Sequence, residues 1–266
     1  MAYEWVKLGI EDNVGTLTLS RNDGPNALSL EFATEITEAL HKLDAMEAVR
    51  VIVLTSGTKA FCVGLDLKDF MNRDLGSAKS SLEFPVQLHD LFDSANSFEE
   101  CKKPVIATVH GMCIGGGLDI IAACDMRLCT EEATFSLREA ALGIVADMGV
   151  LQRLPPIIGQ GFTREMAYTA RFFTAREAER MGLVNTVYPD YTAMMEGANR
   201  LARQIAANPP LAVQSTKDVL NYSRSSTVPN GMSYAMHKNM VLLNSEDLKE
   251  ALSSFMEKRK PDFKGR

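Results

Sequence analysis

Three carboxylates lie in apolar stretches of the chain, where an ionised side chain is poorly solvated. Asp119 follows a run of three glycines, Glu139 lies in FSLREAALG, and Asp147 follows eight residues later in IVADMG. An unpaired buried carboxylate is costly, and burial together with mutual repulsion raises carboxylate pKa values toward those useful for proton transfer near neutral pH. The three acids are therefore candidates for acid–base chemistry.

Each acid taken alone also has a structural explanation. Glu139 could form an ion pair with Arg138 or Arg153, Asp119 could cap a helix, and Asp147 could be an ordinary turn residue. Local context does not choose between these roles and catalysis, because structural ion pairs perturb pKa values as well. The three acids gain meaning only if the fold brings them together.

Two glycine-bearing turns precede these acids. AFCVGLDL (60–67) follows shortly after VRVIVL (49–54), and HGMCIGGGLD (110–119) directly follows PVIATV (104–109). In each, a strand is expected to end, glycines permit unusual backbone angles, and a helix begins. Helix starts present free N–H groups, so two such turns on adjacent strands can aim one N–H each at a single oxygen and form an oxyanion hole. For either turn alone, the alternative is a tight connection where helix and sheet approach closely.

Several other chemistries lack their motifs. The glycines do not match the G-x-G-x-x-G dinucleotide fingerprint, and no G-x-x-x-x-G-K-[ST] loop for nucleotide phosphates occurs. No G-x-S-x-G elbow supports a serine nucleophile. The four histidines are scattered without metal-ligand spacing, so we expect no metal site.

The elements that must position these residues alternate between strands and helices. A hairpin is predicted over 6–19, and Ser29 is expected to cap an amphipathic helix that extends to about Met46. Buried strands are predicted over 49–54, 104–109 and 126–129, and helices over 67–72 and 82–101, joined by a polar stretch over 73–81. This alternation implies parallel strand pairing with right-handed crossovers.

The remainder of the chain is rich in predicted helix. Proline pairs at 155–156 and 209–210 punctuate it, Thr174 is expected to cap a short helix, and a short strand is predicted over 184–187. Further helices are predicted near 192–207, 210–223, 231–244 and 247–258. We therefore divide the chain into a core over 1–190 and a helical C-terminal portion over 191–266, which packs on its own core or on a neighbouring subunit.

Composition narrows the class of protein. The 266 residues are 46% hydrophobic and 23% charged, with a net charge of −6, which argues against a nucleic-acid partner. The apolar stretch over 104–126 contains Asp119 and three glycines, so we expect no membrane span. Five cysteines, odd in number and without a C-x-x-C pair, suggest reduced thiols, and the N-terminus lacks an apolar leader. We expect a cytoplasmic protein.

Five blocks of sequence resemble the enoyl-CoA hydratase/isomerase (crotonase) family. They keep that family's order and spacing over nearly the whole chain: FCVGLDLKDF (61–70), KPVIATVHGMCIGGGLDIIAACDMRLCT (103–130), FSLREAALGIVADMGVLQRLPPIIG (135–159), ARFFTAREAERMGLVNTVYP (170–189) and FMEKRKPDF (255–263). The resemblance implies an α/β fold, a spiral of ββα repeats with a helical C-terminal trimerisation region. It also implies a homotrimer or a hexamer built as a dimer of trimers.

The resemblance also implies a substrate and its binding residues. Members of the family bind an acyl-CoA thioester with its carbonyl oxygen in an oxyanion hole, whose N–H donors match Leu65 and Gly116 here. The CoA-binding residues implied by position are Ala60, Gly64, Leu65, Asp66, Leu67 and Gly116. No separate cofactor is implied, because CoA is part of the substrate.

The acids indicate a branch of the family. Hydratases of the family have glutamates at the positions of Asp119 and Glu139 and normally glycine at that of Asp147. The acids found here, flanked by ACDMRLCT (123–130) and DMGVLQRLP (147–155), resemble those of the Δ3,5-Δ2,4-dienoyl-CoA isomerases of fatty-acid β-oxidation. The chain lacks the N-terminal extension and the peroxisomal C-terminus of animal members, which suggests a bacterial protein.

This resemblance implies roles for the acids. Glu139 would remove a proton at C2, Asp147 would deliver one at C6, and Asp119 would support both, although the first two roles could be exchanged. One alternative is an enoyl-CoA hydratase that holds a water between Glu139 and Asp119. Another is a non-catalytic CoA-ester-binding or scaffold homologue, including an RNA-binding one. The acyl chain length stays open.

Overall fold

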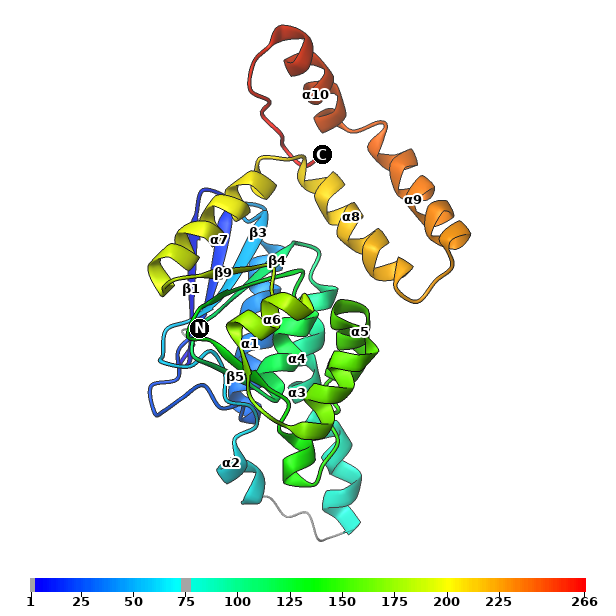
Figure 1. Ribbon diagram of the computed structural model, residues 1–266. Helices are drawn as coiled ribbons and strands as arrows, with labels where there is room; N and C mark the ends of the chain where they lie inside the picture. The colour runs from blue at the N-terminus through cyan, green and yellow to red at the C-terminus, as the bar shows by residue number, and fades with distance from the viewer. Residues whose placement is uncertain (1–2, 73–77) are drawn as a thin grey trace.

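The structure is a computed structural model that describes residues 3–72 and 78–266 (Figure 1). A six-stranded sheet in the order β1-β2-β3-β4-β6-β9 crosses the core. Its first two strands form an antiparallel hairpin, as predicted, and the later neighbours pair in parallel. Its strands are β1 (Val6–Glu11), β2 (Val14–Leu19), β3 (Val51–Ser56), β4 (Val105–Val109), β6 (Met126–Thr130) and β9 (Thr186–Tyr188).

A smaller three-stranded sheet lies beside the first and was not predicted. It consists of β5 (Met112–Ile114), β7 (Thr134–Ser136) and β8 (Phe173–Thr174), with β5 and β7 parallel and β8 antiparallel to β7. These strands contain two or three residues each, too few to show an alternating pattern. In β4-β5-α4 (helix Gly116–Ala123) and again in β6-β7-η1 (3₁₀ turn Glu139–Leu142), the chain places a strand in the large sheet, then one in the small sheet, and then a helical segment, as in the predicted spiral of ββα units.

Helices cover both faces of the large sheet, because alternate residues of its strands point to opposite faces. On one face, Ile52 and Leu54 of β3 pack with the core helices, and on the other Val51 and Val53 pack against α7. The core helices are α1 (Leu30–Ala45), α3 (Ala78–Glu100), α4 (Gly116–Ala123), α5 (Val150–Thr169) and α6 (Ala175–Met181). Two shorter helical segments are α2 (Leu67–Met71) and the 3₁₀ turn η1 (Glu139–Leu142).

The predicted helix caps are confirmed. The Ser29 side chain accepts a hydrogen bond from the N–H of Phe32 at the start of α1, and Thr174 forms a capping box with Glu177 in α6. α3 begins at Ala78, and residues 73–77 of the predicted polar connection lie outside the described residues.

The proline pair at 155–156 lies inside α5 instead of separating two elements. The break in this helix comes at Gly159, whose φ of 79° and ψ of 159° are not helical. A proline costs a helix one N–H donor, but a glycine can adopt the left-handed backbone that a sharp bend requires.

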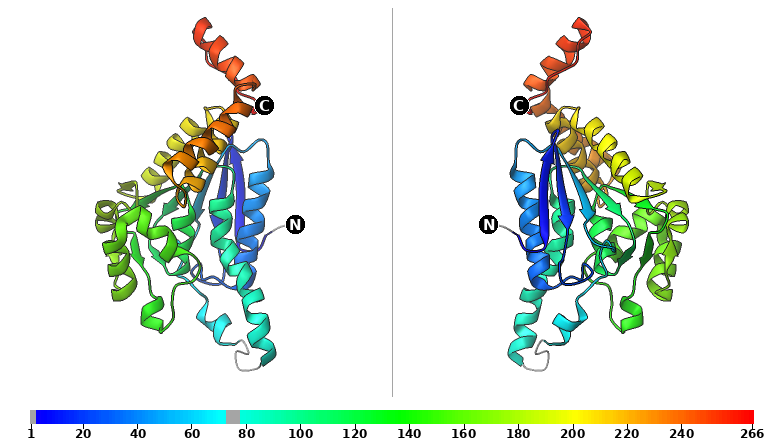
Figure 2. Two further views of the ribbon diagram at one scale, coloured as in Figure 1. Left: turned by 90° about the vertical axis from the view of Figure 1, so that its right-hand side faces the viewer. Right: turned by 90° about the vertical axis from the view of Figure 1, so that its left-hand side faces the viewer.

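Four helices complete the chain, close to the predicted ranges. They are α7 (Tyr191–Ala206), α8 (Pro210–Ser223), α9 (Val228–Leu242) and α10 (Glu246–Glu257). Whereas α7 packs on the large sheet, α8 to α10 extend beyond it, and α10 (red) lies past the end of the sheet in both views of Figure 2. Among the described helices, none is long and apolar enough to cross a membrane.

Candidate active site

The two glycine turns lie against each other. The N–H of Cys62 donates to the carbonyl of Met112 at 3.1 Å, and the N–H of Ile114 donates back to the carbonyl of Cys62 at 2.9 Å. A Cβ added to Gly64 would lie 3.1 Å from the carbonyl oxygen of Ile114 and 3.7 Å from Cα of Gly115. Because both glycines have positive φ, of 84° and 52°, the turns need glycine for backbone angle as well as space.

The residues that follow these turns each present a free N–H. The carbonyl of Gly64 and the N–H of Asp66 both bond to Leu28, which leaves the N–H of Leu65 between them unused. Gly116 is the first residue of α4, a position whose N–H has no partner within the helix. Within residues 3–72 and 78–266, no hydrogen bond has either N–H as its donor. Two such donors beside each other can bind one oxygen that develops negative charge.

Glu139 begins η1 and lies directly over the second turn. A Cβ added to Gly115 would lie 2.8 Å from Oε1 of Glu139. The other carboxylate oxygen, Oε2, is buried and has no hydrogen-bond partner among the described residues. Burial is the main cause that raises the pKa of Glu139, and the negative charge of Asp147 adds to it. Glu139 thus has one carboxylate oxygen without a partner beside the second turn and a raised pKa, as expected of a general base.

Asp119 lies in α4 and is only 1% exposed. Its Oδ1 accepts a hydrogen bond from the N–H of Val150 at 2.7 Å and so caps the start of α5. The pKa of Asp119 is raised to about 7, mainly by burial and also by the charges of Glu139 and Asp147, against the lowering effect of that bond. The sequence left helix capping and acid–base chemistry open for Asp119. The structure shows the capping contact of Oδ1, and Oδ2 takes no part in that contact.

Asp147 is exposed on the loop between η1 and α5. It borders a cavity of about 630 Å³, whose lining also includes Phe92, Met148, Gln152 and Arg153. Its charge raises the pKa of both other acids, so the fold brings all three close enough to interact. The three acids, separated by up to 28 positions in sequence, thus interact through their charges, and Glu139 lies directly against the second turn.

The ion pairs considered for Glu139 do not form. Arg138 instead donates to the carbonyl of Ala170 at 2.7 Å, and Arg153 donates to Glu99 at 2.5 Å. The positive charge of Arg153 nevertheless lowers the pKa of Asp119. Glu99 lies 54 positions from Arg153, and no local sequence signal connects them.

The residues implied for CoA binding differ in their surroundings. Ala60 is buried, whereas Leu67 is 46% exposed at the start of α2. Asp66 caps α2 and forms an ion pair with Arg21 at 2.9 Å. That pairing joins residues 45 positions apart and was not found from the sequence.

The neighbouring glycines also serve close packing. A Cβ on Gly116 would lie 2.6 Å from Cδ1 of Leu28, and one on Gly117 would lie 2.8 Å from Cβ of Cys62. The tight-connection explanation of these turns therefore holds together with the free N–H groups. Among the described side chains, no group of three or more His, Cys, Asp or Glu is arranged to hold a metal ion.

Comparison with known proteins assigns the chain that carries these turns and acids to a family. The model of the enoyl-CoA hydratase/isomerase family matches residues 9–266. The chain belongs to this family. Its fold is that of the family, since the crystal structure of an enoyl-CoA hydratase from Bacillus anthracis is similar with a TM-score of 0.91 and 30% identity, covering 98% of this chain and 100% of that one.

Two curated relatives have a more specific name. The peroxisomal Δ3,5-Δ2,4-dienoyl-CoA isomerase of Arabidopsis thaliana is 41% identical, over 98% of this chain and 96% of that protein. The mitochondrial Δ3,5-Δ2,4-dienoyl-CoA isomerase of Homo sapiens is 37% identical, over 97% of this chain and 81% of that protein. Family membership predicted from the five sequence blocks is thus confirmed, as is the likeness to this branch.

Proposed function

We propose that this protein shifts the double bonds of a 3,5-dienoyl-CoA to give the conjugated 2,4-dienoyl-CoA, as a step of fatty-acid β-oxidation. The observation that carries the proposal is that Asp119, Glu139 and Asp147 interact around one pair of glycine turns with free N–H groups. Relatives named as dienoyl-CoA isomerases support the same reaction.

The reaction needs a stabilised anion. Loss of the C2 proton from the thioester gives a dienolate whose negative charge spreads from the carbonyl oxygen through C2 and C4 to C6. The N–H groups of Leu65 and Gly116 would donate to that oxygen, and one such donor typically contributes about 3–4 kcal/mol to the transition state. Because the electrons only move along the acyl chain, the reaction needs no redox cofactor or metal.

The acids would divide the proton transfer between them. Glu139, over the turn that presents Gly116, removes the C2 proton, and Asp147 returns a proton at C6, so no net proton is consumed. Asp119, whose pKa is raised to about 7, holds the charge balance between the two. The CoA portion would lie along Ala60, Gly64, Leu65, Asp66 and Leu67.

An enoyl-CoA hydratase is the alternative, since solved structures of proteins named as enoyl-CoA hydratases share the fold. A hydratase would hold a water between Glu139 and Asp119. The bond of Asp119 to Val150 already uses one oxygen of that shorter side chain, which favours the isomerase. A non-catalytic CoA-ester-binding protein would not require the buried acids.

One assay separates these functions. The purified protein is incubated with 3,5-octadienoyl-CoA, and the conjugated 2,4-diene is followed by its ultraviolet absorbance. We expect diene formation. Its absence together with rapid hydration of crotonyl-CoA would show a hydratase, and inactivity toward both substrates with CoA esters still bound would show a binding protein.

We also propose that the chain assembles as a homotrimer or a hexamer through its C-terminal helices. Met232, Met236 and Met240 of α9 form an exposed apolar stripe at helical spacing, which a neighbouring subunit would cover. Light scattering on the purified protein measures the assembly, and a monomer at micromolar concentration would contradict it.

The five cysteines are all buried and free, which suits the reducing cytoplasm.

A further inference from the structure

One carboxylate holds two arginines from distant parts of the chain. Glu99, in the last turn of α3, accepts a hydrogen bond from Nε of Arg153 at 2.5 Å and forms a second ion pair with Arg224. Arg153 belongs to α5, whereas Arg224 ends α8. The side chains of Glu99 and Arg153 are 25% and 11% exposed, so removing Glu99 would leave a largely buried guanidinium without its hydrogen-bonded carboxylate partner.

Arg153 in turn holds the loop that carries Asp147. Its Nη1 donates to the carbonyl of Met148 at 3.1 Å, and its Nη2 donates to Oδ1 of Asn96 at 2.7 Å. A Cβ on Gly149 would overlap the guanidinium, so the loop backbone lies directly against it. Arg153 therefore holds the backbone of Met148 and Gly149. Asp147 is the residue directly before Met148, so its position depends on the same contact.

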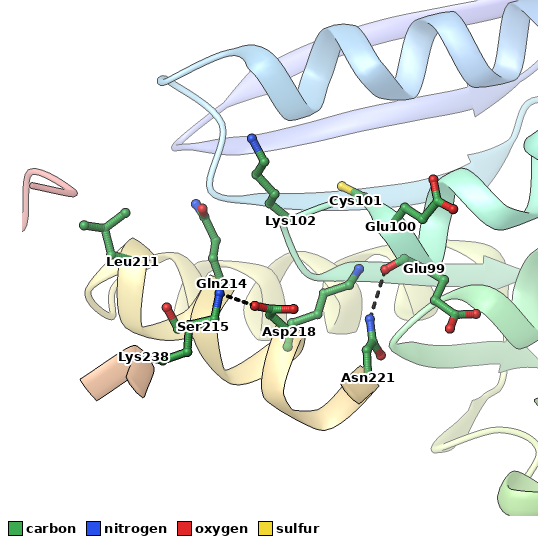
Figure 3. Close-up of a pocket in the computed structure, with 11 residues that line it drawn as sticks. Glu99, Glu100, Cys101, Lys102, Leu211, Gln214, Ser215, Asp218, Asn221 and Lys238 are labelled. Atoms are coloured by element: carbon green, nitrogen blue, oxygen red, sulfur yellow. Dashed lines mark hydrogen bonds and ion pairs between the residues drawn. The ribbon is translucent and has the colours of Figure 1, made fainter. Parts of the chain in front are cut away.

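Glu99 also lies where α8 contacts the end of α3, and one face of α8 makes this contact. Lys217 donates to the carbonyl of Phe98 at 2.9 Å. Asn221, one turn later, donates to the carbonyl of Glu99 at 3.0 Å (Figure 3). Arg224, three residues further, reaches the carboxylate of Glu99. Cationic and amide donors at the last carbonyls of a helix stabilise its end. The last turn of α3 is thus held by the first of the helices that extend beyond the sheet.

From these contacts we infer that Glu99 is a positioning residue for Asp147, acting through Arg153, and that Arg224 links the extended C-terminal helices to the same loop. Among the described residues, Glu99 forms no hydrogen bond or ion pair with the three acids, although it lines the same cavity as Asp147. Its effect is to fix the guanidinium that holds Met148 and Gly149, and thereby the distance of Asp147 from the acyl chain.

The inference rests on the proposed function for its kinetic consequence. If Asp147 delivers a proton to C6, its carboxyl group must lie within about hydrogen-bond distance of that carbon. A displacement of about 1 Å can cost about 100-fold in rate. Binding of the CoA portion along residues 60–67 should change little.

The test uses the full-length protein with Glu99→Gln and Arg224→Gln, and with Glu131→Gln as a matched control at an exposed ion pair with Arg176. Steady-state formation of the 2,4-diene gives kcat and KM. Amide hydrogen exchange, followed by mass spectrometry, reports on residues 143–149 independently of turnover. Thermal melting identifies any variant that fails to fold, and in that case Arg224→Gln carries the test.

We expect Glu99→Gln to lower kcat about 10- to 100-fold with KM changed less than about threefold. Exchange in 143–149 should accelerate in the same variant, Arg224→Gln should show smaller changes of the same kind, and Glu131→Gln should match the wild type. A wild-type kcat in Glu99→Gln, or a lowered kcat with unchanged exchange, overturns the inference. If the wild-type protein forms no diene, the proposed function fails, and the exchange rates alone decide whether Glu99 holds the loop.

Discussion

Burial acts differently on the three acids beside the glycine turns. Asp119 is almost fully buried and Glu139 partly so, and burial is the main cause that raises the pKa of both. Asp147 is exposed and influences the others mainly through its charge. Substitutions at the three positions should therefore have different consequences for stability and for catalysis.

Replacing Asp147 by asparagine removes the proposed C6 acid while keeping the size of the side chain. We expect Asp147→Asn to abolish formation of the 2,4-diene, since the dienolate can then be reprotonated only at C2. Exchange of the C2 proton with deuterated water, followed by NMR, should continue because Glu139 is intact.

Loss of both signals would assign the base role to Asp147 instead, and unchanged diene formation would remove Asp147 from the mechanism. Asp262→Asn is the matched control, because exposed Lys264 is the one partner of the Asp262 side chain within residues 3–72 and 78–266.

Replacing Asp119 by asparagine should stabilise the protein at alkaline pH. The folded-state pKa of about 7 lies above the ordinary aspartate value, so the folded state binds more protons than the unfolded state between the two values. Stability of the wild type therefore falls as pH rises from about 4 through 7, and the full cost, at most about 4 kcal/mol, is present above that range.

Asp119→Asn keeps an oxygen for Val150 and has no charge to bury. Urea denaturation at pH 5 and pH 8 should show a gap between the variant and the wild type that widens at the higher pH. A gap of equal size at both values would contradict the assignment of the buried charge to Asp119.

At the scale of the elements, the sequence predicted what local patterns determine. The hairpin over 6–19, the buried strands β3, β4 and β6, and the Ser29 cap follow from alternation, apolar runs and capping chemistry. The small sheet could not be predicted, because its two- and three-residue strands are defined by their partners. The same holds for pairs such as Arg21–Asp66, which only the fold brings together.

The second glycine turn gives a prediction at this scale. Gly115→Ala places a methyl group at a φ of 52° and 2.8 Å from the carboxylate of Glu139. We expect a loss of about 1–3 kcal/mol in the free energy of unfolding from the strained backbone and a large fall in kcat as Glu139 is displaced.

Gly161→Ala is the matched control, since a Cβ there meets no atom within 4 Å in a helical stretch. Chemical denaturation and the diene assay compare the two variants. A Gly115→Ala protein with wild-type kcat would show that Glu139 is not placed by this turn.

At the scale of the whole molecule, the attachment of α8 to the core depends on a buried cation. Lys217 is only 5% exposed and bonds to two carbonyls and to Asp125 at 2.9 Å. We expect Lys217→Met to cost about 3 kcal/mol of unfolding free energy, because Asp125 and the carbonyls lose their partner.

The control is Lys238→Met, which removes a more exposed ion pair with Asp218 and should cost less than about 1 kcal/mol. Guanidinium denaturation measures both variants. Equal losses would mean that the buried lysine does not anchor α8 to the core.

The bond between Asp119 and the start of α5 bears on how such an enzyme can be re-engineered. The glutamate implied for hydratases at this position is one methylene longer, so in the side-chain conformation of Asp119 its oxygen would no longer lie 2.7 Å from the N–H of Val150. Exchange of the acid alone would thus leave a helix without its cap. Conversion of the isomerase into a hydratase would require coordinated changes at residue 119 and over 147–150. A library that varies these positions together should therefore yield hydratase activity that single substitutions do not.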